Sequence, residues 1–263
     1  MVPITDVYQR VLVVLNKENR GYVTRDEFSS LAQQAQLEIF ESYFTKHALS
    51  IAGENDTTYS NPVENVSEKI HFFSVTSEAL TDDTTNNGFF VYPGPIQDSS
   101  GNDIGGGFYR LGVVRVFGAN GVPVIADEVA HNDITYINLS PLTAPTRTQP
   151  VFTRLTRVIN QQIQEGVQVY PIPLGPDPSI GRPDDSYTIE LDYLRRPLDP
   201  VFTGTVVGQQ VLPGANDVNF ELHASEEIEL TNRILAYMGV VTRDAEVAGF
   251  ASQQAQQITA SEQ

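Results

Sequence analysis

The 263-residue chain contains no cysteine. This absence excludes disulfide bonds, thiolate chemistry and cysteine-based zinc sites, and it fits assembly in a reducing compartment. No apolar run approaches the roughly 18 residues that a membrane-spanning helix needs, and the longest candidate, VLVVL at 11–15, is far too short. The N-terminal MVPITDVYQR also lacks the basic start and apolar stretch of a secretory signal. We therefore expect no membrane partner and no secretion.

Basic residues are scarce. Sixteen Lys and Arg stand against 33 Asp and Glu, the formal net charge is −17, and no lysine follows Lys69. A basic footprint for nucleic acid is therefore absent overall. Residues 50–104 hold nine acids and one base, whereas residues 110–157 hold five arginines and three acids. The acidic surface either serves solubility alone or faces a polyanion that must pass without binding.

The signatures of common catalytic sites are missing as well. The chain has no G-x-S-x-G, H-E-x-x-H, Walker or G-x-G-x-x-G motif. Asp82-Asp83 and Asp184-Asp185 could each bind a divalent ion, and His131-Asn132-Asp133 could form an acid–base pair, but solvated loops and turns account for all three. The histidines also lack the spacing of metal ligands; they are His47, His71, His131 and His223. We predict no catalytic, metal-binding or cofactor-binding residue, and no cofactor.

The stretch NKENRGYVTRDEF, Asn16 to Phe28, has the Gly and Glu spacing of a calcium-binding EF-hand loop, with Gly21 at position 6 and Glu27 at position 12. Position 5 of the loop, which must supply an oxygen ligand, is Arg20, which has no acceptor and would place a positive charge beside the cation. As an alternative, Gly21 can supply a backbone position with positive φ after a first helix, and Thr24 to Glu27 matches a capping box. We therefore predict a connection between two helices.

Both ends of the chain show helical periodicity. Apolar residues recur at helical spacing from Ile4 to Leu15, and a second stripe begins at Phe28 and is widened by Phe40 and Phe44. A helix that is apolar on several sides packs against more than one neighbour, either in this chain or in another subunit. Pro62 is placed to open a short helix.

The final segment is also predicted to be helical. Near the C-terminus, SEEIELTNRILAYMGV is expected to be a helix capped by Ser225 and ended by Gly239, with Ile234 and Met238 on its apolar surface. A weak last helix is expected from Thr242 onward.

The middle of the chain has a different pattern. Short β-rich runs are separated by clusters of Gly, Pro, Asn and Asp. Asn120-Gly121 predicts a hairpin turn, and the ambiguous RLTRVINQQIQEG is taken as strand. The predicted strands lie in IHFFSV, GFFVY, FYRLGVVRVF, VPVIA, ITYINL, VQVYPIPL and SYTIELDYL.

These patterns predict an α+β fold in which a helical bundle from both chain ends carries an inserted, mostly antiparallel β domain. The predicted limits are an N-terminal helical part at 1–66, a β-rich domain at 67–222 and C-terminal helices at 223–263. Arg195 and Arg196 end a predicted strand, where they can bind phosphate, pair with carboxylates of a neighbouring subunit or form internal salt bridges. The candidate subunit-interface residues are Arg195, Arg196, Phe40, Phe44, Ile234 and Met238.

Three segments of the chain are VYQRVLVVLNKENRGYVTRDEFSSLAQQAQLEIFESYF, DYLRRPLDPVF and ELHASEEIELTNRILAYMGV. These segments resemble structural proteins of tailed-bacteriophage virions, especially those of crAss-like and related short-tailed phages. The similar proteins are head–tail connector, or adaptor, rings of the neck. The resemblance implies a homo-oligomeric ring of twelve copies that contacts portal protein and other neck and tail rings. Genomic DNA would pass through it without sequence-specific binding, in a virion assembled in the host bacterial cytoplasm.

We therefore expect a non-enzymatic ring protein of the phage neck, lining or surrounding the DNA channel. A different virion role, in a tail tube or as a capsid decoration, is the first alternative. The second is a carbohydrate-binding or hydrolase β module that uses the loop acids as its site. Helices with surplus apolar surface at both ends favour the ring, and a deep cleft lined by paired acids would favour the module.

Overall fold

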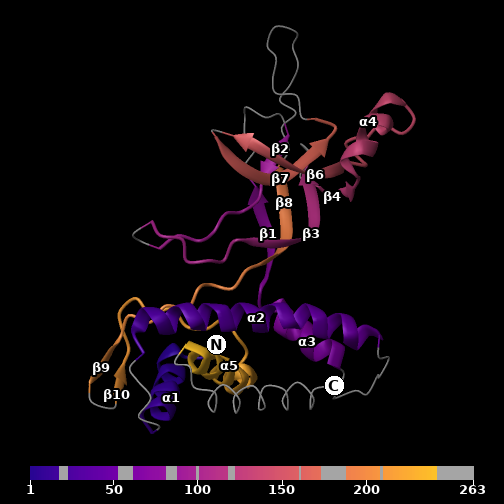
Figure 1. Cartoon of the computed structure of the whole chain (residues 1–263). Coiled ribbons are helices and arrows are strands. Elements are labelled where there is room, and N and C mark those ends of the chain that lie inside the picture. The colour runs from indigo at the N-terminus through magenta and orange to yellow at the C-terminus, as the bar shows by residue number, and fades with distance from the viewer. Residues whose placement is uncertain are drawn as a thin grey trace. The chain divides into compact units, whose positions relative to one another are not determined.

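A computed structural model describes residues 1–17, 23–52, 62–80, 88–98, 101–117, 122–159, 161–172, 188–207 and 210–241 (Figure 1). Within these ranges the fold is mixed α+β, with five α-helices and mainly antiparallel sheets, which confirms the predicted fold class at this level. The chain divides into two compact units. Unit 1 comprises Met1–Phe72 and Pro197–Gln263, and unit 2 comprises Phe73–Arg196.

Unit 1 contains four of the α-helices: α1 (Ile4–Lys17), α2 (Arg25–Ala52), α3 (Pro62–His71) and α5 (Glu227–Val241). The long helix α2 packs against α3 and α5, and α1 also packs against α5. The side chains that fill this core are fully or almost fully buried, because the apolar stripes of the helices face one another. They include Ile4, Val7, Tyr8, Val11, Phe28, Ala32, Ile39, Leu230 and Ile234.

The start of α2 follows the predicted capping box. The Thr24 backbone N–H donates to Glu27 Oε2 at 2.9 Å, and the Glu27 N–H donates to Thr24 Oγ1 at 3.3 Å. These reciprocal bonds satisfy donors that have no partner inside the helix. They also hold the pKa of Glu27 below its ordinary value, because the Thr24 N–H and hydroxyl favour the charged carboxylate. Gly21, the other predicted turn residue, lies outside the described residues.

The predicted β-rich domain extended to residue 222. In the structure, residues 197–222 belong instead to unit 1. The Gln36 side chain on α2 donates to the Leu198 carbonyl at 2.7 Å and accepts from the Glu221 N–H at 3.1 Å. The first residues of the chain join the same region, since Val2 and Phe220 form an antiparallel bridge. Strands β9 (Thr205–Val207) and β10 (Gln210–Leu212) pair in a small hairpin, and β10 packs on α1.

Unit 2 is built from two four-stranded sheets, ordered β1-β8-β3-β4 and β2-β7-β6-β5. Ten buried side chains from both sheets share one core, including Phe90, Val114, Phe152, Val167 and Leu191. All pairs are antiparallel except the short β5–β6 pair. The strands are β1 (Ser74–Leu80), β2 (Phe89–Val91), β3 (Phe108–Phe117), β4 (Pro123–Ile125), β5 (Asp127–Glu128), β6 (Val151–Ile159), β7 (Gln162–Tyr170) and β8 (Thr188–Arg195).

Two ambiguous segments of unit 2 have different outcomes. The expected strand in RLTRVINQQIQEG is confirmed, since it forms most of the β6–β7 hairpin, with Gln161 at φ 66° in the connection. The expected strand in ITYINL is wrong, because those residues belong to helix α4 (His131–Leu139). Only Ile134 of this helix is buried, so the alternating pattern does not correspond to a core-facing strand. β3 and β4 pair as the predicted hairpin, but its Asn120-Gly121 turn lies outside the described residues.

Two details of α5 also differ from expectation. Ser225 is not the cap: a 3₁₀ turn (Ala224–Glu226) precedes α5, and His223 Nδ1 accepts from the Ser225 N–H at 3.3 Å. Gly239 does not end the helix, which continues to Val241. Gly239 is buried, and tertiary packing can hold a glycine inside a helix despite its low propensity. The helix expected from Thr242 onward lies outside the described residues.

Candidate functional site

The structure gives no support to the loop acids as a site. Asp82-Asp83 and Asp184-Asp185 both lie outside the described residues. His131, Asn132 and Asp133 form the exposed first turn of α4, rather than the turn that was expected. Among the described residues, no group of three or more His, Cys, Asp or Glu could hold a metal ion. Those residues also contain no helix long and apolar enough to cross a membrane.

Three of the six predicted interface residues lie in the core of unit 1. Phe40, Ile234 and Met238 are at most 1% exposed, which leaves no side-chain surface for another subunit. Their apolar stripes serve helix packing within the chain, the other interpretation that the sequence allowed. Phe44 is half-buried and meets the Phe40 ring edge-on, with centroids 5.2 Å apart.

The two predicted arginines end unit 2. Arg195 is half-buried at the end of β8, and its Nη1 donates to the Arg196 carbonyl at 3.3 Å. The Arg196 side chain is exposed, while its backbone N–H donates to the Gly107 carbonyl at 2.8 Å. The backbone at this strand end is therefore fixed, and Arg196 presents its guanidinium to solvent.

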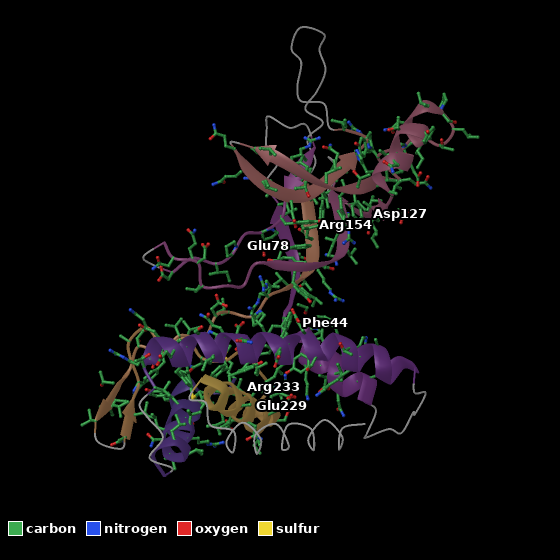
Figure 2. The ribbon with its side chains drawn as sticks, viewed as in Figure 1. Phe44, Glu78, Asp127, Arg154, Glu229 and Arg233 are labelled. Atoms are coloured by element: carbon green, nitrogen blue, oxygen red, sulfur yellow. The ribbon has the colours of Figure 1, made fainter. Side chains whose placement is uncertain are left out.

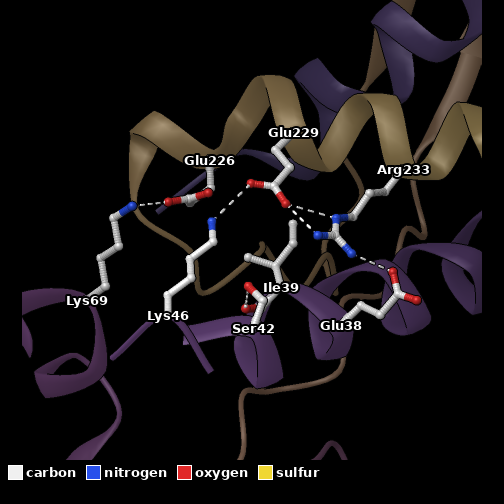
Figure 3. A network of polar contacts seen from close by, with 8 residues as sticks. All are labelled: Glu38, Ile39, Ser42, Lys46, Lys69, Glu226, Glu229 and Arg233. Atoms are coloured by element: carbon white, nitrogen blue, oxygen red, sulfur yellow. Dashed lines mark hydrogen bonds and ion pairs between the residues drawn. The ribbon is translucent and has the colours of Figure 1, made fainter. Parts of the chain in front are cut away.

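Unit 1 contains a buried ionic network that the sequence did not reveal (Figure 3). Glu229 on α5, only 3% exposed, accepts two bonds from Arg233 one helical turn later, at 3.0 and 2.6 Å. Arg233 also donates to Glu38 on α2 at 2.6 Å, and Lys46 Nζ lies 4.0 Å from Glu229. The only local signal was the spacing of Glu229 and Arg233, which places both on one helix face.

A second ion pair extends this network. The carboxylate of Glu226, 2% exposed, accepts from Lys69 at the end of α3. The network thus joins α2, α3 and α5, and Glu226 and Glu229 within it are almost fully buried, whereas the Glu38 side chain is 49% exposed. Breaking one partner of such a pair leaves the other buried and uncompensated, so the network specifies how these three helices pack.

Glu229 is ionised in this environment. Burial alone would raise its pKa, but the hydrogen bonds and charge of Arg233, together with the charge of Lys46, hold the pKa below its ordinary value of 4.5. Burial alone would lower the pKa of Arg233, but the hydrogen bonds and charges of Glu229 and Glu38 raise it. Both groups stay charged across the neutral range, which is the behaviour of a structural ion pair rather than of a catalytic acid.

The β1-β8-β3 surface of unit 2 has its own polar contacts. Arg115 on β3 donates from both terminal nitrogens to Asp192 on β8, with one bond at 2.9 Å. Glu78 on β1, which is labelled in Figure 2, accepts from the Tyr193 hydroxyl at 3.4 Å. Burial and the adjacent Glu78 raise the pKa of Tyr193 to about 12, so its hydroxyl is a donor at neutral pH. These contacts join neighbouring strands of the sheet.

Exposed apolar side chains mark two further features of unit 2. The first, which we name the α4 surface, consists of Tyr136, Leu139 and Leu142, which are 74%, 75% and 94% exposed. The second, the hairpin tip, consists of Val158 on β6 and Ile163 on β7, which are 73% and 75% exposed. Clusters of this kind at one place on a soluble protein are typical of interaction sites.

Neither a protein-family model nor a curated protein matches the chain.

Proposed function

We propose that this chain is a structural protein of a tailed-bacteriophage virion, and that its copies form a ring in the neck around the path of the DNA. In this proposal both chain ends form one helical bundle, and the β-rich unit is an insertion between them. The contacts among α1, α2 and α5 support this arrangement, because the first and last described helices pack together.

The observation that carries the proposal is the pair of exposed apolar features on unit 2, the α4 surface and the hairpin tip. A ring needs two different complementary patches on each subunit, because every copy contacts one neighbour on each side. Resemblance to connector proteins supports the neck as the location and twelve as the copy number.

The charge distribution fits a channel for DNA. Residues 1–72 and 197–263 contain 19 acids and eight bases, so unit 1 carries most of the excess negative charge. An acidic lumen repels phosphates, so a genome passing through it would not adhere.

Negative-stain electron microscopy of the purified protein, with a gel-shift assay on duplex DNA, tests this function. We expect closed rings with an open centre and no retained DNA at physiological salt. The proposal would be overturned by particles that stay monomeric at every concentration, alone and with portal protein of the same phage. Tight binding of duplex DNA would contradict the non-adhesive channel.

A further inference from the structure

We propose that a projecting arm of unit 2 reaches to the next copy of the chain and pairs its Asp103 with that copy's Arg196. The arm comprises residues 93–98 and 101–107, which lie between β2 and β3. This contact rests on the proposed function and deepens it, because it names charged groups through which copies of the ring would join.

The two sides of the arm pair with each other. The Ile96 N–H donates to the Gly105 carbonyl, and the Ile96 carbonyl accepts from the Ile104 N–H, both at 2.8 Å. Nearer the tip, Gln97 and Asp103 form an antiparallel bridge, and the Gln97 side-chain amide donates to Asp103 Oδ1 at 3.1 Å. These bonds make the arm a two-stranded ribbon.

The arm is fixed at its base and exposed farther out. The Phe108 N–H donates to the Pro93 carbonyl at 3.2 Å, and the rings of Tyr92 and Phe108 stack with their centroids 3.8 Å apart. Figure 1 shows the arm extending away from the two sheets as a magenta trace, and its Ile96 and Gln97 side chains are exposed. A fixed base and an exposed outer part suit a segment that contacts another molecule rather than the core of its own unit.

The charge of the arm is of one sign. Its described residues contain Asp98 and Asp103 and no Lys or Arg. Asp103 is exposed, and the group that donates to it is the neutral Gln97 amide. Two arms would repel each other because like charges would meet, so the complement of the arm on a second copy is a cation.

Arg196 is the exposed cation that fits this requirement. Other cations already pair with carboxylates of their own copy: Arg10, Lys46, Lys69, Arg115, Arg154 and Arg233. Four more contact a carbonyl, an amide or a ring: Arg25, Arg110, Arg157 and Arg195. The Arg196 side chain is exposed, and no carboxylate of the described residues pairs with its guanidinium. An exposed guanidinium in a chain of net charge −17 is therefore open to a carboxylate of a neighbour.

The acid and the cation lie at opposite ends of the arm. Arg196 lies at the base, where its backbone N–H donates to the Gly107 carbonyl at 2.8 Å. Asp103 precedes Gly107 by four residues, which corresponds to about 13 Å at roughly 3.3 Å per residue. Each copy can therefore give its arm tip to one neighbour and receive the arm of the other at its base. A contact between two different surfaces of identical subunits is the kind that closes into a ring.

The ion pair determines which surfaces meet rather than how tightly they hold. An exposed ion pair contributes little free energy by itself, whereas complementary charges set the orientation and the choice of partner. Ile96, 46% exposed on the arm, can add an apolar contact. In a closed ring each copy is held at two such contacts, so the individual contact need not be strong.

A charge exchange tests the pairing. Asp103→Arg and Arg196→Asp each bring like charges together, so each should raise the concentration of half-assembly about tenfold at low salt. The double variant Asp103→Arg/Arg196→Asp restores an opposite pair and should assemble like the wild type. Light scattering over a dilution series measures all four proteins. Normal assembly of either single variant, or a double variant no better than the single ones, would overturn the pairing.

Two further variants serve as controls. Asp103→Asn removes the charge but keeps an oxygen that can accept from Gln97, so the arm should stay intact while assembly weakens. Glu41→Arg changes the charge as Asp103→Arg does, at an exposed position of α2, and should neither impair assembly nor rescue Arg196→Asp. Rescue by Glu41→Arg would show that net charge controls assembly, and would overturn the role of the arm.

Chemical crosslinking separates this contact from the ring itself. The chain has no cysteine, so Gln97→Cys in one copy and Leu194→Cys in another supply the only thiols, while Asp103 and Arg196 stay in place. A short bismaleimide should link these two positions between copies, whereas Ile228→Cys, 62% exposed on α5, should not link to Gln97→Cys. Linked copies without closed rings would keep the contact and reject the ring. Closed rings without this link would keep the ring and reject the contact.

Discussion

At the scale of single residues, two charged contacts link α5 to α2: Arg233 on α5 bonds Glu38 on α2, and Lys46 on α2 lies 4.0 Å from Glu229 on α5. The Glu229–Arg233 bonds at 3.0 and 2.6 Å lie within α5 and hold the guanidinium in place, and the bond from Arg233 to Glu38 at 2.6 Å links α5 to α2. Apolar packing alone tolerates small rotations of a helix. A charged bond between the helices does not, because rotation of α5 would separate Arg233 from Glu38.

Replacing Glu229 with Gln should lower the free energy of unfolding by about 2 kcal/mol, the scale of a buried hydrogen bond to a charged group. Arg233 keeps Glu38 as a partner, which limits the loss. Urea unfolding followed by circular dichroism measures the change. Glu41→Gln, at an exposed position of α2, is the matched control and should have little effect. A Glu229→Gln variant as stable as the wild type would show that the pair contributes nothing.

The same pair predicts a pH dependence. The pKa of Glu229 is lower in the folded chain than its ordinary value of 4.5, so the unfolded chain binds the proton more readily. The stability from this group is therefore complete above about pH 4.5 and is lost as the pH falls through the lower folded value. Unfolding curves from pH 6 to pH 3 should show a smaller decline in Glu229→Gln than in the wild type. Parallel declines in the two proteins would contradict the assignment.

At the scale of elements, close backbone packing fixes the position of β2 against β7. A Cβ atom added at Gly166 would lie 2.1 Å from the Phe90 carbonyl oxygen and 2.9 Å from Cζ of Phe89. Gly166 pairs with Val91, so this collision falls where the two strands meet. Only a residue without a side chain allows this approach.

Gly166→Ala should therefore destabilise unit 2 by about 1–3 kcal/mol, the usual cost of overpacking. Thermal unfolding measures this loss. Gly94→Ala is the control, because a Cβ there meets nothing within 4 Å. Equal melting temperatures for the two variants would mean that β2 can move away from β7 without cost.

The elements also show how far the sequence could predict the structure. Thr24 and Glu27 were predictable because the capping box is a local pattern of four residues. The helix at ITYINL could not be predicted, because the surroundings override the β propensity of this segment. Ile134 is the one buried residue of helix α4.

Contacts between distant residues account for most of what the sequence missed. Gln36 on α2 binds Leu198 and Glu221, which lie 162 and 185 positions away, so no local pattern assigns residues 197–222 to the helical unit. The pairing of Lys69 with Glu226 is hidden for the same reason. Burial likewise depends on the partner elements, so the apolar Phe40, Ile234 and Met238 could not be assigned to a core or to an interface from periodicity alone.

At the scale of the whole molecule, the net charge of −17 opposes association of copies, so oppositely charged patches must compensate. Arg195 and Arg196 are candidates for pairing with the acid-rich residues 50–104 of a neighbouring copy. Reversing both charges with Arg195→Glu and Arg196→Glu should weaken assembly, and the double Lys variant, which keeps the charge, should retain more of it. High salt should weaken wild-type assembly as well. A reversed variant that assembles normally, together with a ring indifferent to salt, would exclude this pairing.

The most direct test of the whole account is the molar mass of the wild-type protein, measured by multi-angle light scattering over a dilution series. One chain has a mass of 29.0 kDa. We predict a single large species at a fixed multiple of this mass, which dissociates on dilution and when Leu139→Asp or Ile163→Asp is introduced. A mass of one chain at every concentration, unchanged on addition of portal protein of the same phage, would contradict the ring and leave the exposed apolar features of unit 2 without the role assigned to them.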